Sequence, residues 1–227
     1  MEMKETKKSI LKVLEKDGKK KASKFDRMVL LLALQKIESD SFDFDGEAIY
    51  TDDKRFLVYC LSQNESFVVP ESVEVIGEMA FRRKKNLKGV VLPAGLRKIS
   101  RDAFFDCDQL DNVYIPASVS EVNGYSFAEC DGLRTVTFAS KPKHLSRHAF
   151  EDSDHLMRMI IPQGTSEYFQ KALHYDSIED EYLFVENKGK SEVETPTQTA
   201  DKTPSKSKKE GKKYDKKSVK TDGQDKK

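Results

Sequence analysis

The chain has 227 residues, 35% of them charged, and a formal net charge of only +1. This length suits one folded domain with flanking segments. Its three cysteines are an odd number and do not form the paired pattern of a small secreted protein stabilised by disulfides.

The first predicted elements are helical. A basic, partly ordered segment covers residues 1–22, in which residues 8–15 can form a short amphipathic helix. A second helix is predicted within residues 23–41, with Ser23 as N-cap and Asp26 at the third helical position. Its predicted apolar face contains Phe25, Met28, Val29, Leu32 and Ile37, widened by Leu30, Leu31 and Leu34. We expect this helix to cover the N-terminal end of the repeats that follow.

The apolar run at residues 28–34 has a second interpretation as the core of a secretion signal. The charged segment before it is too long for such a signal, and no small-x-small cleavage motif follows Gln35. The run is also far too short to cross a bilayer. We therefore expect a cytoplasmic protein without a membrane span, with the cell surface as the alternative location.

The middle of the chain repeats with a period of 23 residues. Four phenylalanines keep this interval: Phe81, Phe104, Phe127 and Phe150. Four leucines keep it too: Leu87, Leu110, Leu133 and Leu156. The proline slot holds Pro70, Pro93, Pro116, Ala139 and Pro162. Such a repeat predicts a solenoid, in which each unit stacks on its copies and shares one core.

Each repeat contains a main strand. At residues 110–116, apolar Val113 and Ile115 alternate with Tyr114, which is strand periodicity. The proline that follows ends the strand because it has no amide hydrogen to donate. Stacked copies predict a parallel sheet with rungs about 4.8 Å apart.

The second half of each repeat returns the chain to the core. We expect a short strand around residues 96–99, followed by a tight helical turn that carries Ala103 and Phe104. The phenylalanine column would fill the interior. Asn123 stands where the first unit has Gly77, which would loosen a local turn without disturbing the stacking.

The stretches at residues 69–81 and 103–110 resemble the BspA-type leucine-rich repeat family. Segments at residues 45–59 and about 160–185 are similar to the family's hairpin-like unit and its closing unit. The resemblance covers residues 42–185. It implies an α/β-type repeat solenoid, a right-handed leucine-rich-repeat stack with a parallel β-sheet of short strands. Family members include surface adhesion proteins and intracellular proteins, and no catalytic site comes with the resemblance.

Cys107 and Cys130 occupy one repeat position, which Lys84 and Ser153 fill in the neighbouring units. We expect both thiols on adjacent rungs, facing the core, where parallel side-chain directions disfavour a disulfide. Buried thiols, with Cys60 as the third, fit a cytoplasmic protein.

His144 and His148 are four residues apart, with His155 nearby, a spacing that can bind a metal when it falls on a helix. Leu145 between them is a core repeat position, so we expect turn residues rather than ligands. The chain has no phosphate-binding glycine-rich loop and no nucleophile elbow. We assign no catalytic residue, metal ligand or cofactor.

Acidic residues recur after the phenylalanines, and a stacked acidic ribbon could bind Ca²⁺. The ribbon contains Asp106, Asp108, Glu129, Asp131, Glu151, Asp152 and Asp154. The glycine-rich nonapeptide of calcium-binding solenoids is absent, so a solvated edge is the preferred interpretation. The basic residues 82–85 of the preceding unit are expected to face acidic neighbours and help to fix the register.

The outward positions of the main strands are the best candidates for contact with a protein partner. The central row contains Val91, Tyr114, Thr137 and Ile160, and the row beside it contains Gly89, Asn112, Thr135 and Arg158. Tyr114 and Arg158 suit the role of anchors. The alternative is that these residues were selected only for their β-propensity.

The C-terminal segment, residues 186–227, is predicted to be a disordered Lys-rich tail. Residues 187–227 contain 13 lysines and seven acidic residues but only one aromatic residue, Tyr214. This composition cannot bury enough apolar surface to offset the chain entropy lost on folding. Nucleic acid is an unexpected partner, because acidic residues are interspersed and no series of aromatic residues offers base stacking.

These features predict a non-catalytic, monomeric protein–protein interaction module whose rigid repeats display side chains at fixed intervals. One alternative is a cell-surface adhesin that binds host or matrix proteins. A further alternative is a tether to nucleic acid or an anionic surface through the Lys-rich tail.

Overall fold

The computed structural model describes residues 5–6, 24–37, 41–174 and 183–187. Three predicted features lie outside these described residues: the helix over residues 8–15, the N-cap Ser23 of the second helix, and the tail from residue 188 onward. Contacts divide the chain into two compact units, Met1–Glu192 and Val193–Lys227, and every described residue belongs to the first.

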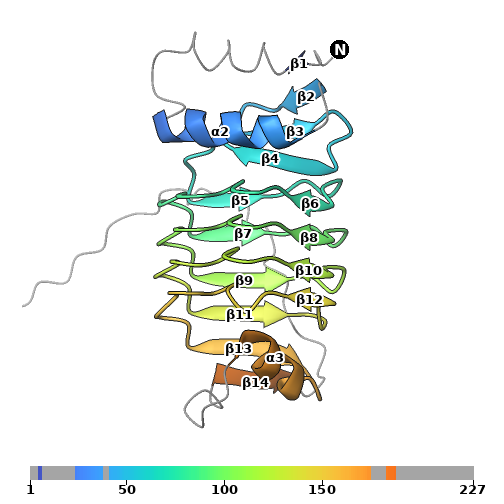
Figure 1. The fold of residues 1–227 in the computed structure, drawn as a ribbon, viewed down its shortest axis with the longest axis vertical. Helices are drawn as coiled ribbons and strands as arrows, with labels where there is room; N and C mark the ends of the chain where they lie inside the picture. The colour runs from blue at the N-terminus through green and yellow to red at the C-terminus, as the bar shows by residue number, and fades with distance from the viewer. Residues whose placement is uncertain (1–4, 7–23, 38–40, 175–182, 188–227) are drawn as a thin grey trace, which may run out of the picture. The chain divides into compact units, whose positions relative to one another are not determined.

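The main strands form a six-stranded parallel sheet that runs along the repeat axis (Figure 1). Its strands, in spatial order, are β5 (Ser66–Val68), β7 (Gly89–Val91), β9 (Asn112–Ile115), β11 (Thr135–Phe138), β13 (Arg158–Pro162) and β14 (Phe184–Asn187). Proline or alanine follows the apolar end of the repeat strands, as the sequence predicts. The parallel leucine-rich-repeat stack is therefore confirmed.

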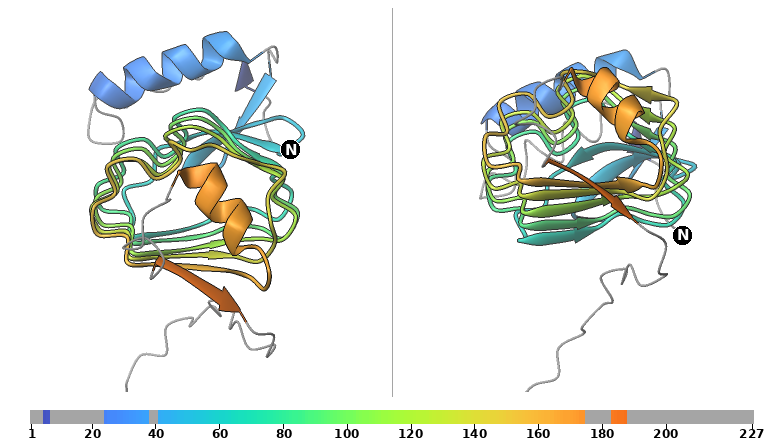
Figure 2. Two further views of the ribbon diagram at one scale, coloured as in Figure 1. Left: turned by 60° about the horizontal axis from the view of Figure 1, so that its bottom comes forward. Right: turned by 90° about the horizontal axis from the view of Figure 1, so that it is seen from below.

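The short second strands form an eight-stranded sheet on another side of the coil (Figure 2). Its repeat strands are β6 (Val75–Ile76), β8 (Lys98–Ile99), β10 (Glu121–Val122) and β12 (His144–Leu145). Its N-terminal strands are β1 (Glu5–Thr6), β2 (Ser41–Phe44), β3 (Ala48–Thr51) and β4 (Phe56–Cys60). Strands β1 to β4 pair antiparallel with one another and form an N-terminal hairpin region. β4 then pairs parallel with β6, so the parallel stack begins at the last strand of this hairpin region.

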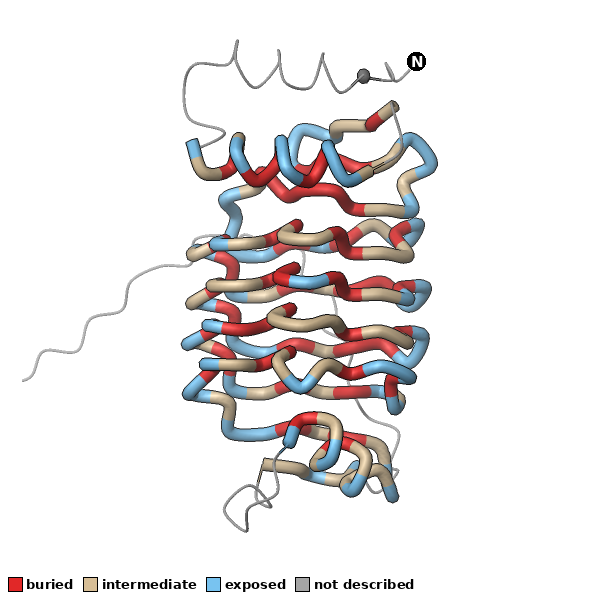
Figure 3. The backbone as a smooth tube through the Cα atoms, in the orientation of Figure 1, coloured by how far each residue is buried: buried red, intermediate tan, exposed pale blue. Residues whose placement is uncertain are grey.

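The 23-residue period sets the register of both sheets. Val113 lies opposite Val136, and Ile99 lies opposite Val122. In both pairs the second residue follows the first by one 23-residue repeat. Equivalent positions are therefore neighbours, and buried positions recur on every rung (Figure 3).

The phenylalanine column lies in the core, as predicted. The ring of Phe104 is fully buried and stacks on Phe81 at 4.7 Å and on Phe127 at 5.0 Å between ring centroids. Phe127 stacks in turn on Phe150 at 5.5 Å. One aromatic column therefore joins four consecutive units.

The turn that carries Ala103 and Phe104 is not helical, which corrects the prediction. The amide of Phe104 donates to the carbonyl of Ser126 on the next rung at 2.7 Å, instead of to its own segment. Asp102 and Asp106 have φ values of 56° and 62°, and these left-handed residues bend the chain around the corner. The amides of Ala103 and Phe105 donate within the turn, whereas those of Asp102, Phe104 and Asp106 donate to the next rung, so alternate amides link the rungs.

The N-terminal helix α2 (Lys24–Lys36) covers the hairpin end of the core, but its predicted face is partly wrong. Val29 is buried, whereas Met28, Leu31 and Leu32 are 51%, 41% and 42% exposed. The buried side of α2 consists of Asp26, Val29, Leu30, Ala33 and Leu34, at helical spacing. A polar residue in the first turn of α2, Asp26, is buried there and contacts Tyr59 and Lys84.

The C-terminal end of the core is covered by α3 (Ser166–Leu173), which lies across the opening of the coil (Figure 2). Phe169 is fully buried, with its ring centroid 4.9 Å from that of Phe138, and Leu173 is buried beside it. β14 then adds a last parallel strand to β13.

The cysteines are buried free thiols, as predicted. Cys107 donates to the carbonyl of Phe81, and Cys130 donates to the carbonyl of Phe104, both at 3.1 Å. Ser153 makes the equivalent bond to Phe127 at 2.8 Å, so one polar column links the rungs. Burial raises the pKa of the Cys130 thiol to about 12.

Candidate interaction surfaces

The central row proposed on the six-stranded sheet is continuous in the structure. Thr137 lies opposite Tyr114 on one side and opposite Ile160 on the other. Val91 occupies the same position of β7, and all four side chains are partly exposed. The repeats therefore place one largely apolar row on the outer face of this sheet.

Two residues that the sequence analysis missed extend this row. Val68 pairs with Val91 and is 54% exposed, and Val185 pairs with Ile160 and is 42% exposed. Val68 lies one period before Val91, so the repeat could have identified it. Val185 follows Ile160 by 25 residues because α3 interrupts the repeat, and the period alone would not find it.

The second predicted row also lies in register. Thr135 pairs with Asn112 and with Arg158, and Gly89 pairs with Asn112. Asn112 and Arg158 are exposed. Beside this row Met157 is 70% exposed, so the C-terminal end of the face combines an apolar and a cationic group.

The two proposed anchors have polar groups without intramolecular partners. Neither the hydroxyl of Tyr114 nor the guanidinium of Arg158 makes a hydrogen bond or an ion pair within the part of the chain that the structure describes. In contrast, the amide of Asn112 donates to Asp111 at 2.7 Å. Tyr114 and Arg158 therefore keep their donors available for another molecule.

The basic residues 82–85 were predicted to face acidic neighbours. Three of the four pair with acidic residues of the next rung. Arg82 lies 3.0 Å from Asp102, Arg83 lies 3.3 Å from Asp106, and Lys85 contacts Asp106 and Asp108. Burial raises the pKa of Asp102, while the Arg82 guanidinium acts in the opposite direction. Lys84 is different, because it points into the core and contacts Asp26.

The histidines occupy separate environments. His144 lies in β12, so its segment is not helical. The ring of His148 stacks on Tyr125 at 5.3 Å, and its Nδ1 lies 2.9 Å from Glu151. Among the described residues, no three potential ligands gather at a point that could hold a metal ion.

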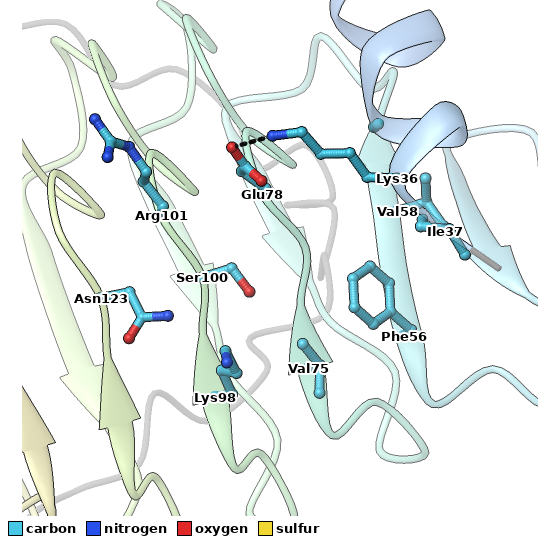
Figure 4. Close-up of a pocket in the computed structure, with 11 residues that line it drawn as sticks. Lys36, Ile37, Phe56, Val58, Val75, Glu78, Lys98, Ser100, Arg101 and Asn123 are labelled. Atoms are coloured by element: carbon cyan, nitrogen blue, oxygen red, sulfur yellow. Dashed lines mark hydrogen bonds and ion pairs between the residues drawn. The ribbon is translucent and has the colours of Figure 1, made fainter.

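A groove that the sequence analysis did not identify lies on the eight-stranded sheet beside α2 (Figure 4). Its volume is about 590 Å³. It is lined by Ala33, Lys36 and Ile37 of the helix end, and by Phe56, Val58, Val75, Glu78, Lys98, Ser100, Arg101 and Asn123. Lys36 and Glu78 form an ion pair of 2.6 Å that closes one side.

Neither of the described helices, α2 and α3, combines the length and the apolar character that crossing a bilayer requires.

Several solved structures of leucine-rich repeat proteins are similar to this chain. One from Eubacterium ventriosum has a TM-score of 0.51 and 21% identity, over 54% of this chain and 33% of its own. One from T. pallidum has a TM-score of 0.41 and 21% identity, over 49% and 66%. A leucine rich cell surface protein from Faecalibacterium prausnitzii has a TM-score of 0.38 and 15% identity, over 62% and 42%. The chain thus spans about a third of the Eubacterium ventriosum protein.

No curated protein matches the sequence significantly. The sequence profile described as BspA type leucine rich repeat region does match, in six copies over residues 53–179, which is more than half of the chain. The matched range contains the stacked strands from β4 to β13. The chain belongs to the BspA-type leucine-rich repeat family.

Proposed function

We propose that the protein is a non-catalytic interaction module, and that the outer face of the six-stranded sheet binds a protein partner. The contact residues would be Val91, Asn112, Tyr114, Thr135, Thr137, Arg158 and Ile160. The observation that carries the proposal is the pairing of an apolar row with two anchors, Tyr114 and Arg158, whose polar groups have no partner in the described chain. Tyrosine and arginine are enriched among the residues that dominate binding energy at interfaces.

The stacked architecture favours binding by a preformed surface. Each inner strand of the six-stranded sheet is fixed by hydrogen bonds to both neighbouring strands, and the rungs share the phenylalanine column. Side chains on such a frame lose little additional conformational entropy when a partner docks. Rigid display therefore accounts for affinity without any reaction chemistry.

We propose a monomer that is located in the cytoplasm. The three buried free thiols Cys60, Cys107 and Cys130 support this location. Fractionation of cells that produce the native protein would test the location. Recovery in the cell-surface fraction would favour the alternative of an adhesin that binds host or matrix proteins.

The binding face is tested by affinity capture with the full-length chain. The double variant Tyr114→Ala/Arg158→Ala is compared with the wild type, and Arg97→Ala serves as the control. Arg97 is 69% exposed in its side chain and lies outside the proposed face. We expect proteins that are retained by the wild type and the control to be lost with the double variant. Equal retention by all three folded proteins would place the binding site elsewhere.

A further inference from the structure

The groove beside α2 forms where the helix ends and the eight-stranded sheet below it continues. α2 packs on β4 through residues such as Leu30 and Val58, and it ends at Lys36. The eight-stranded sheet continues beyond the helix as β6, β8 and β10, and no other described element covers their outer face there (Figure 4). The groove volume of about 590 Å³ lies within the range of about 300–1,000 Å³ that is usual for ligand sites.

The end of the groove next to the helix is apolar. Ile37, Phe56 and Val75 line it, and Phe56 lies directly opposite Val75 in the strand register. The Phe56 ring lies against the sheet because Gly77 has no side chain, and a Cβ there would come within 2.7 Å of the ring. This end offers apolar side chains a partly preformed contact surface.

The other end of the groove is polar, with Lys98, Ser100, Arg101 and Asn123 on its floor and rim. Ser100 is only 9% exposed, yet its hydroxyl makes no hydrogen bond within the described part of the chain. Its Oγ atom is not among the fully buried side-chain atoms that have no partner, so it is accessible from the groove. The hydroxyl can therefore donate a hydrogen bond to a ligand atom at this end.

The charges at the polar end favour an anion. Lys98 forms an ion pair of 2.8 Å with Glu121. Arg101 forms a long ion pair of 3.8 Å with Asp102, too long for a hydrogen bond, and its guanidinium packs over the ring of Tyr125 at 5.0 Å. Its N–H groups are thus held in place and remain available. The planar guanidinium fork matches the two oxygens of a carboxylate.

The length of the groove suits a short extended chain. Its floor crosses the consecutive rungs β4, β6, β8 and β10, from Phe56 to Asn123. Three spacings of about 4.8 Å give roughly 14 Å, which about four extended residues span at about 3.3 Å each.

We propose that this groove binds a short extended peptide segment in which apolar residues are followed by an acidic residue. The apolar side chains would contact Ile37, Phe56 and Val75. The carboxylate would accept hydrogen bonds from Arg101 and from the hydroxyl of Ser100. This site is separate from the proposed binding face on the six-stranded sheet.

The test is a titration of the full-length, ¹⁵N-labelled protein with acetylated tetrapeptide amides, followed by NMR. The peptides carry Leu, Val or Phe at the first two positions and end in Ala-Glu, and a matched set ends in Ala-Gln. We expect saturable shifts of the Ser100, Arg101 and Asn123 amide signals with at least one Glu peptide, while Tyr114 stays unchanged. The absence of such shifts with every Glu peptide, or equal binding of the Gln set, would overturn the proposal.

Variants and a small carboxylate complete the experiment. Arg101→Gln should weaken binding at least about tenfold, because a charge-assisted hydrogen bond is lost. The control Arg97→Gln, on the same side of the repeat but outside the groove, should change the affinity less than about twofold. Ser100→Ala should weaken binding several-fold without altering the fold. Unchanged affinity in Arg101→Gln would contradict the site, and hexanoate binding as tightly as the peptide would contradict a peptide ligand.

Tyr114→Ala separates this inference from the proposed function. The substitution should leave peptide binding in the groove unchanged while it weakens capture of a protein by the six-stranded sheet. Loss of peptide binding in this variant would contradict the groove as the site.

Discussion

The ammonium group of Lys84 donates a hydrogen bond of 3.0 Å to the carboxylate of Asp26, and both residues are buried. The hydroxyl of Tyr59 donates to the same oxygen at 2.6 Å. The three groups join α2, the hairpin and the first full repeat. Lys84 occupies the repeat position that Cys107 and Cys130 fill on later rungs. A lysine in place of cysteine at this position of the first full repeat therefore provides the contact that holds α2 against the repeats.

Removing one member of this buried pair should destabilise the protein strongly. We expect Lys84→Met to lower the free energy of unfolding by about 3–5 kcal/mol, because the buried carboxylate of Asp26 would lose its cationic partner. The double variant Asp26→Leu/Lys84→Met should recover a large part of that loss, since no charge remains. Urea unfolding followed by circular dichroism measures both values.

Lys85→Met is the matched control for this pair. Lys85 is 43% exposed in its side chain and pairs with Asp106 and Asp108 at the surface. Such pairs contribute about 0–1 kcal/mol, so the variant should unfold close to the wild type. Equal destabilisation by Lys84→Met and Lys85→Met would show that the buried pair has no special role.

The phenylalanine column should be sensitive at its centre. Phe104→Ala should lower the free energy of unfolding by about 3–5 kcal/mol, because the cavity would separate the rings of Phe81 and Phe127. The neighbouring Phe105 is only partly buried and packs against the Arg82 guanidinium at 4.0 Å. Phe105→Ala should therefore have a clearly smaller effect in the same urea titration, and comparable losses would argue against a shared aromatic core.

The 23-residue period was sufficient to predict the solenoid, the phenylalanine column and the in-register rows of the outer face. These features depend only on which positions repeat, because equivalent residues of stacked units become neighbours. Tyr114 and Thr137 are opposite each other for this reason. Whether this row binds a partner stays a prediction.

The period could not predict contacts between elements that do not repeat. In α2, three consecutive leucines, Leu30 to Leu32, leave several faces apolar, and the buried face is the one that contains Asp26, whose partner Lys84 lies far along the chain. The groove likewise depends on where α2 ends above the sheet. The corner at Ala103 was misjudged because alternate amides, such as that of Phe104, bond to the next rung, a partner that a single repeat does not contain.

The buried thiols should make the protein sensitive to alkaline pH. An unfolded chain loses its thiol protons near pH 9.0, whereas burial raises the pKa of Cys130 to about 12 in the folded state. Between these values the folded state binds more protons than the unfolded state, so the free energy of unfolding falls as pH rises. Each such thiol contributes a slope of up to about 1.4 kcal/mol per pH unit.

Cys130→Ser isolates this effect, because Ser153 already makes the equivalent hydrogen bond in the next repeat. The variant should differ from the wild type by about 1 kcal/mol or less at neutral pH. Its urea midpoint should then decline less steeply between about pH 9 and about pH 11. Parallel declines of both proteins would show that Cys130 does not contribute.

Gly77 should be intolerant of a side chain, although later repeats carry Ser100 and Asn123 in the same slot. An added Cβ would lie 2.6 Å from the carbonyl oxygen of Leu57 and 2.7 Å from the ring of Phe56. Gly77→Ala should therefore displace the opening hairpin and lower the free energy of unfolding by about 1–3 kcal/mol. Gly95→Ala is the control, because its Cβ would meet only the Glu71 carbonyl at 3.8 Å, an ordinary contact. A stability of Gly77→Ala equal to that of Gly95→Ala would mean that Phe56 moves aside freely, and the apolar end of the groove would then not be preformed.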